Sequence, residues 1–139
     1  MNVKRIIAML LVSVFLVALT ACAKTSDYTL GYGESDMYSK EDIESAAKAV
    51  LDEFNTFDGC VLYSLEYAGD EKCNDELSYV NSLREDGAEE FVDCLVFNSE
   101  FRSPIKGGDA WTPNDIYTWS WYLGREKDGE WILLTYGYA

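Results

Sequence analysis

Between residues 39 and 57, apolar side chains recur three and four positions apart, the spacing of an α-helix with one buried face. Ser39 and Asp42 match a capping box, in which each side chain bonds the other residue's backbone N–H. We therefore expect a helix that starts at Ser39 and ends near Phe54 to Phe57, before Asp58-Gly59. Its apolar stripe consists of Ile43, Ala46, Ala47, Val50, Leu51 and Phe54.

Two shorter segments alternate apolar and polar residues, the period of a β-strand. They are residues 60–68 and 90–97, and residues 74–85 between them predict a second, shorter helix. The faces expected from strict alternation are Val61/Tyr63/Leu65/Tyr67 in the first strand and Val92/Cys94/Val96 in the second.

The C-terminal part of the chain predicts a long loop followed by a β-hairpin. The loop covers residues 98–116, and a loop of this length in a compact domain is often functional. Residues 117–125 and 131–138 predict the hairpin strands, with Asp128-Gly129 in the turn. The expected faces are Tyr117/Trp119/Trp121/Leu123 with Trp131/Leu133 and, on the reverse of the last strand, Ile132/Leu134/Tyr136/Tyr138.

The order helix, strand, short helix and three strands is typical of an α+β fold. We expect an N-terminal helix packed on a curved antiparallel sheet of about four strands, shaped like a cystatin-like or NTF2-like cone. This single α+β domain should span residues 39–139. The shape is an analogy from element order, and a fold alone does not set a function.

The N-terminal segment has the pattern of a lipoprotein signal peptide over residues 1–21. Its apolar run from Ile6 to Leu19 has 14 residues, short of the roughly 20 that span a membrane. The small residues before Cys22 form a lipoprotein cleavage box, so we expect lipidation at Cys22 by diacylglyceryl and palmitate groups. Residues 22–38 lack periodicity and predict a lipidated tether. The domain should therefore lie outside the cytoplasm, anchored to the cell membrane.

After removal of residues 1–21 the side chains include 9 Lys and Arg against 25 Asp and Glu, a formal balance of −16. Such a surface repels nucleic-acid phosphates, so no nucleic-acid partner is expected. Protein or glycan ligands remain open, and the acids also serve solubility. The chain has no histidine, which removes the usual general base and zinc ligand. We therefore lean against an enzyme and expect no cofactor.

Three cysteines remain beside the expected lipidated one. Cys60 and Cys73 would close a loop that the entropy model values at about 3 kcal/mol, so this disulfide is possible. A Cys60–Cys94 bridge is also possible, and a buried free thiol is the third interpretation of Cys94. By strict alternation, Asp93 is expected on the same strand face as Phe91, Leu95 and Phe97. If that face is buried, Asp93 needs a partner such as Arg102 or Arg125.

The candidate binding residues are aromatic and acidic side chains of the long loop and the hairpin: Trp111, Trp119, Trp121, Tyr117, Asp109 and Asp115. In one interpretation the rings stack on a sugar, and the two aspartates hydrolyse it as a carboxylate pair. In the preferred one the tryptophans are core and the aspartates form turns. A calcium site at Asp109, Asn114 and Asp115 is a third interpretation.

A pattern over residues 39–138 resembles uncharacterised small lipoproteins of clostridia-type gut bacteria. It comprises Phe57-Asp58-Gly59-Cys60-Val61-Leu62, Thr112-Pro113-Asn114, Tyr117, Trp119-Ser120-Trp121, Arg125, Gly129, Trp131 and Tyr136-Gly137-Tyr138. The resemblance implies an extracytoplasmic lipoprotein and no particular activity. We expect a non-catalytic binding or interaction module. The alternatives are a carboxylate-dependent glycan hydrolase and an accessory or inhibitory subunit of an envelope protein.

Overall fold

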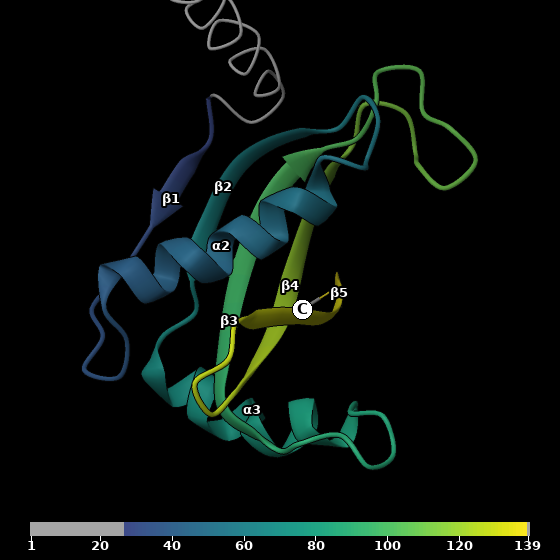
Figure 1. The fold of residues 1–139 in the computed structure, drawn as a ribbon. Coiled ribbons are helices and arrows are strands. Elements are labelled where there is room, and N and C mark those ends of the chain that lie inside the picture. The colour runs from purple at the N-terminus through teal and green to yellow at the C-terminus, as the bar shows by residue number, and fades with distance from the viewer. Residues whose placement is uncertain (1–26, 139) are drawn as a thin grey trace, which may run out of the picture.

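The computed structural model describes residues 27–138, which form an α+β fold with two helices and a five-stranded mixed sheet (Figure 1). The elements are β1 (Thr29–Gly31), α2 (Lys40–Phe54), β2 (Val61–Tyr67), α3 (Asp70–Ser82), β3 (Phe91–Arg102), β4 (Ile116–Glu126) and β5 (Trp131–Tyr138). The strands lie in chain order, β1 parallel to β2 and the others antiparallel. The α+β class is confirmed, but the sheet has five strands rather than about four. The expected signal peptide and Cys22 lie outside the described residues.

The additional strand, β1, comes from the segment that we expected to be a tether. Leu30 pairs with Leu65 of β2. Farther along, the Ser35 hydroxyl donates to Asp70 at 2.6 Å, and the buried Tyr38 hydroxyl donates to the Cys94 carbonyl at 2.7 Å. These contacts make residues 29–38 part of the fold. Within residues 27–138, no helix is long and apolar enough to cross a membrane.

Helix α2 starts as its sequence predicts. The Asp42 N–H donates to Ser39 Oγ at 3.1 Å and the Ser39 N–H donates to Asp42 Oδ2 at 3.2 Å, which completes the capping box. At the other end, the Phe54 ring lies 5.3 Å from the Phe101 ring and 6.4 Å from the Trp121 ring, centroid to centroid. The apolar stripe of α2 therefore contacts β3 and β4.

Helix α3 begins at Asp70, four residues before the predicted start, because the Gly69-Asp70 step already turns into the helix at a φ of +100° for Gly69. Cys73 and Val80 are its buried residues, and the Val96 N–H donates to Cys73 Sγ at 3.3 Å. The Tyr79 ring of α3 lies 5.4 Å from the Tyr122 ring of β4, and Tyr122 points to the face opposite its neighbour Trp121 because side chains alternate along a strand. Helix α3 thus lies on the face opposite α2, at one end of β3 (Figure 1).

Three irregularities in the strand pairing of residues 27–138 change which side chains share a face. The one between Phe91 and Asp93 pairs Phe91 with Glu126 and Asp93 with Arg125, so the expectation that Phe91 and Asp93 share a face is wrong. The irregularity between Leu62 and Ser64 buries Leu62 in place of Val61 and Tyr63, so the expected face of β2 is wrong at its start. In the hairpin, Tyr122 pairs with Thr135 and Leu123 pairs with Leu133. The extra residue between those partners moves the rest of β5 to the other face, because side chains alternate with a period of two.

This shift places Tyr136 opposite Trp121 and Tyr138 opposite Trp119, on the face that α2 contacts. The prediction that both tyrosines lie on the reverse is therefore wrong. Strand β3 is also longer than expected, and the loop that follows it shortens to residues 103–115. The reason is that the polar residues Asn98 and Glu100 lie on the open face of the sheet, while Phe101 between β2 and β4 is fully buried.

The partner of Asp93 is Arg125, one of the two predicted candidates. Arg125 Nη2 lies 2.9 Å from Asp93 Oδ2, and Arg125 Nη1 lies 2.8 Å from Asp42 Oδ1 at the start of α2. The guanidinium also lies 4.4 Å from the Trp131 ring centroid. One cation therefore joins α2, β3 and β5.

We expect Arg125→Met to lower the free energy of unfolding by about 1–2 kcal/mol at pH 7. This is less than the 3–5 kcal/mol typical of a buried pair, because both carboxylates keep about 30% exposure and water screens them. The hydrogen bond from Arg125 is the main cause that lowers the pKa of Asp42. A pKa lowered by folding gives stability that is present at neutral pH and lost as the pH falls below about 4.

Urea unfolding at a series of pH values between about 2 and 7 measures this effect. The Arg125→Met protein should lose less stability on acidification than the wild type, since part of the Asp42 shift is gone. Arg102→Met is the control, because Arg102 bonds Tyr63 and Asn114 rather than a carboxylate. If the wild type and Arg125→Met lost stability identically as the pH falls, Arg125 would not be the cause of the lowered pKa of Asp42.

Candidate functional site

Two of the predicted binding residues belong to the core. Trp121 is fully buried and its Nε1 donates to Ser99 Oγ at 2.8 Å. Tyr117 is 8% exposed, its ring stacks on Phe101 at 5.4 Å, and its hydroxyl accepts from the Thr112 N–H at 3.2 Å. Both therefore leave the candidate site, because α2 and the long loop cover their part of the sheet.

The other two predicted tryptophans, Trp111 and Trp119, are half-buried and lie 5.7 Å apart by ring centroid. They belong to a group of partly exposed rings that we call the aromatic patch. Its members are Phe57, Trp111, Trp119, Tyr136 and Tyr138. Beneath it lie the buried rings of Phe54, Phe101, Tyr117 and Trp121.

Trp119 is the centre of the aromatic patch. Its ring centroid lies 6.0 Å from that of Phe57, 5.6 Å from that of Tyr136 and 6.1 Å from that of Tyr138. Tyr136 is 36% exposed and Tyr138 is 75% exposed, so these two rings form the outer edge of the patch. Because Trp119 contacts all four other rings, the patch is one continuous surface.

Separate segments of the chain position these rings. Phe57 follows the end of α2 in a turn closed by the Cys60 N–H, which donates to the Phe57 carbonyl at 3.1 Å. Trp111 is held in the loop by a β-bridge with Gly108. At Gly107 the φ is +71°, and an added Cβ would lie 2.8 Å from Pro113 Cγ, so the loop requires glycine there.

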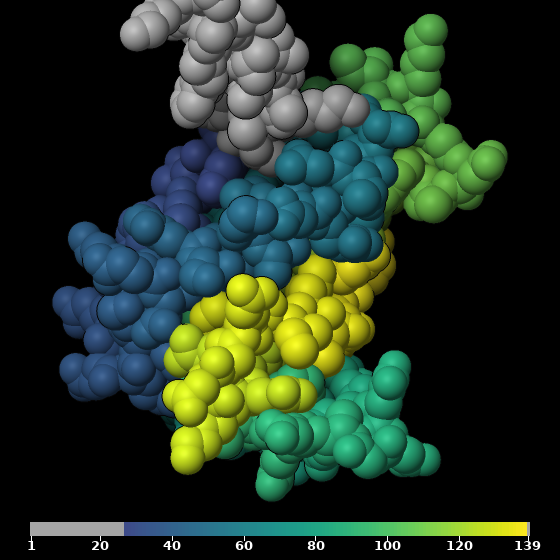
Figure 2. All heavy atoms as spheres, in the orientation of Figure 1, coloured from purple at the N-terminus to yellow at the C-terminus, as the bar shows by residue number. Residues whose placement is uncertain are grey.

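Trp119 comes from β4, and Tyr136 and Tyr138 come from the edge strand β5, which reaches the surface between α2 and α3 (Figure 2). The Tyr136 hydroxyl donates to Glu53 Oε1 at 2.8 Å, which ties β5 to α2. Burial, followed by that hydrogen bond and the Glu53 charge, raises the pKa of Tyr136, so its phenol stays protonated. The patch thus carries a neutral hydroxyl bonded to a carboxylate.

Phe57, Tyr136 and Tyr138 were missed from the sequence. The break at Asp58-Gly59 was a usable signal for Phe57, since a ring at a helix end lies near the surface. The two tyrosines had no such signal, because their face depends on the bulge in β5.

Asp109 lies in the loop between β3 and β4, and Asp115 lies directly before β4. Both are exposed. The Asp115 carboxylate accepts a hydrogen bond from the Ile116 N–H at 2.9 Å, and the Asp115 backbone N–H donates to Ser103 Oγ at 2.8 Å. Asp115 therefore shapes the turn before β4. Asn114 Oδ1 accepts from Arg102 at 3.1 Å rather than facing a cation. In the described part of the chain, no group of three or more acids or cysteines could hold a metal ion.

The possible Cys60–Cys73 disulfide is not formed: Cys60, Cys73 and Cys94 are all free and buried. Strand β2 separates Cys60 from Cys73 by roughly 20 Å, since a strand rises about 3.3 Å per residue, and a disulfide requires Cα atoms within about 7 Å. Burial raises the pKa of the Cys94 thiol to about 12. The interpretation of Cys94 as a buried thiol is therefore confirmed.

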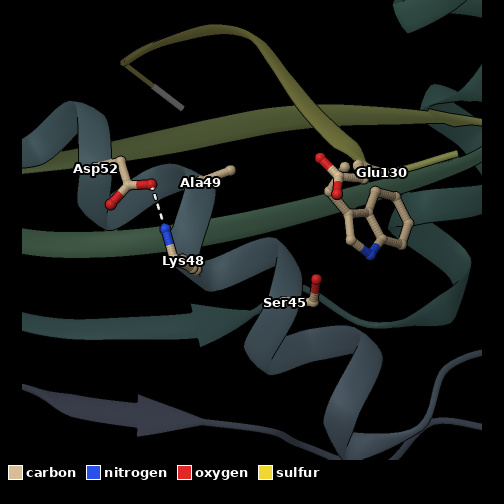
Figure 3. A pocket seen from close by; sticks show the side chains of 6 residues that line it. Ser45, Lys48, Ala49, Asp52 and Glu130 are labelled. Carbon is tan, nitrogen blue, oxygen red and sulfur yellow. Dashed lines mark hydrogen bonds and ion pairs between the residues drawn. The ribbon is translucent and has the colours of Figure 1, made fainter.

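Other recesses lie outside the aromatic patch. One of about 290 Å³ lies between α2 and β5 and is lined by Ser45, Lys48, Ala49, Asp52, Glu130 and Trp131. Figure 3 shows Lys48 and Asp52 joined along α2 at 2.7 Å, with Glu130 across the recess. The hydrogen bond to Asp52 is the main cause that raises the pKa of Lys48. Its cation is therefore already paired.

A second recess of about 350 Å³ lies on the open face of the sheet, with Ser64, Glu66, Asn98, Glu100 and Thr118 among its lining residues. It is polar and acidic, and it shares the residue Trp119 with the aromatic patch. No protein-family model, curated protein or solved structure matches this chain.

Proposed function

We propose that this protein is a lipid-anchored module that binds a ligand outside the cytoplasm and has no catalytic activity. The aromatic patch is the observation that carries the proposal. Tyrosine and tryptophan are enriched among the residues that dominate binding energy, because they offer a large contact area for little loss of rotamer freedom. A contiguous exposed group of such rings is typical of an interaction site.

The anchor is supported by the cleavage box before Cys22 and by the basic start and apolar run that precede it. The resemblance to small lipoproteins of clostridia-type gut bacteria supports the same location. The excess of acids keeps an exported domain soluble. An accessory or inhibitory subunit of an envelope protein is one form that such a binding module takes.

We also propose that the sheet curves around α2 as in a cystatin-like or NTF2-like cone. The support is the contact of Phe54 with Phe101 and Trp121, together with the bulges in β2 and β5. Bulges increase the local bend and twist of a sheet. In this arrangement the aromatic patch lies at the end of α2, where the helix no longer covers the strands.

Binding of the full-length lipidated protein to a panel tests the function. The panel contains neutral oligosaccharides, cationic peptides and acidic peptides, presented to the protein in a nonionic detergent. We expect at least one class to bind the wild type and to bind Tyr138→Ala at least fivefold more weakly. Tyr63→Ala is the matched control, because Tyr63 is 40% exposed and lies outside the patch.

Equal binding by the two variants would contradict the role of the aromatic patch, and so would the absence of binding to every class. Turnover of an oligosaccharide by the wild type would contradict the non-catalytic assignment. Tyr138→Ala should remain folded, because its ring is largely exposed.

A further inference from the structure

We infer that the ligand of the aromatic patch is a cationic polypeptide segment, rich in arginine or lysine. The inference rests on the proposed function, since it names the partner of the same surface. Its first support is charge. The chain carries 25 acidic against 11 basic residues, and two of the basic ones precede the expected cleavage site. A partner of opposite charge is attracted from solution and correctly oriented by this field, whereas anionic ligands are repelled.

The second support is the placement of cations over other aromatic rings of this protein. Cations lie over three rings elsewhere: Arg125 over Trp131 at 4.4 Å, Lys40 over Tyr32 at 5.3 Å and Lys72 over Tyr122 at 6.0 Å. Cations are attracted to the electron-rich face of a ring. Within residues 27–138 no cation lies over any ring of the aromatic patch, although Tyr136 and Tyr138 are exposed there.

Lys72 shows the combination of groups that would hold a cation. Its ammonium lies 2.6 Å from a Glu76 oxygen and 6.0 Å from the Tyr122 ring centroid, so a carboxylate and a tyrosine ring bind it together. The aromatic patch also places a carboxylate beside a tyrosine: Glu53 accepts a hydrogen bond from the Tyr136 hydroxyl at 2.8 Å. Among the residues described, Glu53 forms no ion pair with a lysine or arginine.

A cleft of about 300 Å³ lies on the α3 side of the sheet and meets the patch at the edge strand β5. Its lining includes Glu76 and Tyr79 of α3 together with Tyr136 and Tyr138 of the patch. An extended peptide that places one basic side chain at Glu53 and Tyr136 and then passes around the edge of β5 would meet further acidic and aromatic groups along this cleft. This continuity favours a polypeptide over a single small cation.

The probe is a blocked ten-residue peptide of alternating arginine and glycine, and its binding to the full-length lipidated protein is measured by fluorescence anisotropy. We expect Glu53→Gln and Tyr138→Ala each to weaken binding about fivefold to tenfold, and Tyr63→Ala to leave it within twofold. Binding should also weaken as salt is raised, because the attraction is between charges at a solvent-exposed surface. A serine–glycine peptide of the same length and a neutral hexasaccharide are the comparison ligands.

Two results would overturn the inference. Equal affinity of the wild type, Glu53→Gln and Tyr138→Ala for the arginine peptide would show attraction by overall charge alone. Binding of the hexasaccharide but not of the arginine peptide, lost in Tyr138→Ala, would leave the binding function of the patch standing and replace its ligand by a glycan. Circular dichroism of each variant confirms that a loss of binding is not a loss of fold.

Discussion

Trp121→Ala is expected to lower the free energy of unfolding by about 3–5 kcal/mol, the range for removing a large buried aromatic side chain. Trp121 is fully buried, and its ring lies 6.4 Å from Phe54, 6.1 Å from Phe57 and 4.7 Å from Tyr136, centroid to centroid. The substitution would therefore leave a cavity where α2 meets the sheet. It would also remove the hydrogen bond that the indole N–H donates to Ser99 Oγ.

Urea unfolding of the full-length protein, followed by circular dichroism, measures the change. Tyr138→Ala is the control from the same aromatic cluster, and its cost should stay within about 0.5 kcal/mol because the ring is largely exposed. Ser99→Ala should cost about 1–3 kcal/mol, since it leaves a buried indole N–H without an acceptor. If Trp121→Ala and Tyr138→Ala cost the same, the division between core and patch is wrong.

Gly124→Ala is expected to lower the free energy of unfolding by about 1–3 kcal/mol, the usual cost of overpacking. A Cβ at this position would lie 2.6–2.8 Å from three atoms of the Phe91 ring. The ring cannot easily move away, because Asn81 holds Phe91 on both sides of its backbone. Asn81 accepts from the Phe91 N–H at 2.9 Å and donates to the Phe91 carbonyl at 3.0 Å.

Gly137→Ala is the matched control, because Gly137 is also in a β-strand and a Cβ there meets no atom within 4 Å. It should be close to neutral. A second test combines Gly124→Ala with Phe91→Leu, which shortens the obstructing side chain. If the clash is the cause, the double variant is more stable than the sum of the two single changes predicts. Simple additivity would contradict the steric explanation.

The sheet has two faces with different roles. On one face, Phe54 of α2 covers the buried rings of Phe101 and Trp121, and the aromatic patch begins where the helix ends. The other face is covered by α3 at one end and is polar and acidic elsewhere. A binding partner therefore meets an apolar surface whose surroundings are negatively charged, which is the basis of the proposed cationic ligand.

The sequence by itself determined the features that depend on neighbouring residues. The capping box of Ser39 and Asp42, the apolar stripe of α2 and the Asp128-Gly129 turn were predicted correctly, because each follows from contacts within a few residues. The α+β class followed from the order of these elements. For Asp93 the sequence provided only a condition, a partner such as Arg102 or Arg125 if its face is buried, and the structure shows that the partner is Arg125.

The tertiary structure alone decided which aromatic residues are exposed and which are core. Trp119 and Trp121 lie two positions apart on the same face of β4, and only the place where α2 ends leaves one of them half-buried and the other enclosed. The bulge in β5 brought Tyr136 and Tyr138 to that face, and the length of β2 kept Cys60 away from Cys73. These outcomes depend on strand register and on distances between elements, and the alternation of residues along a single strand contains neither.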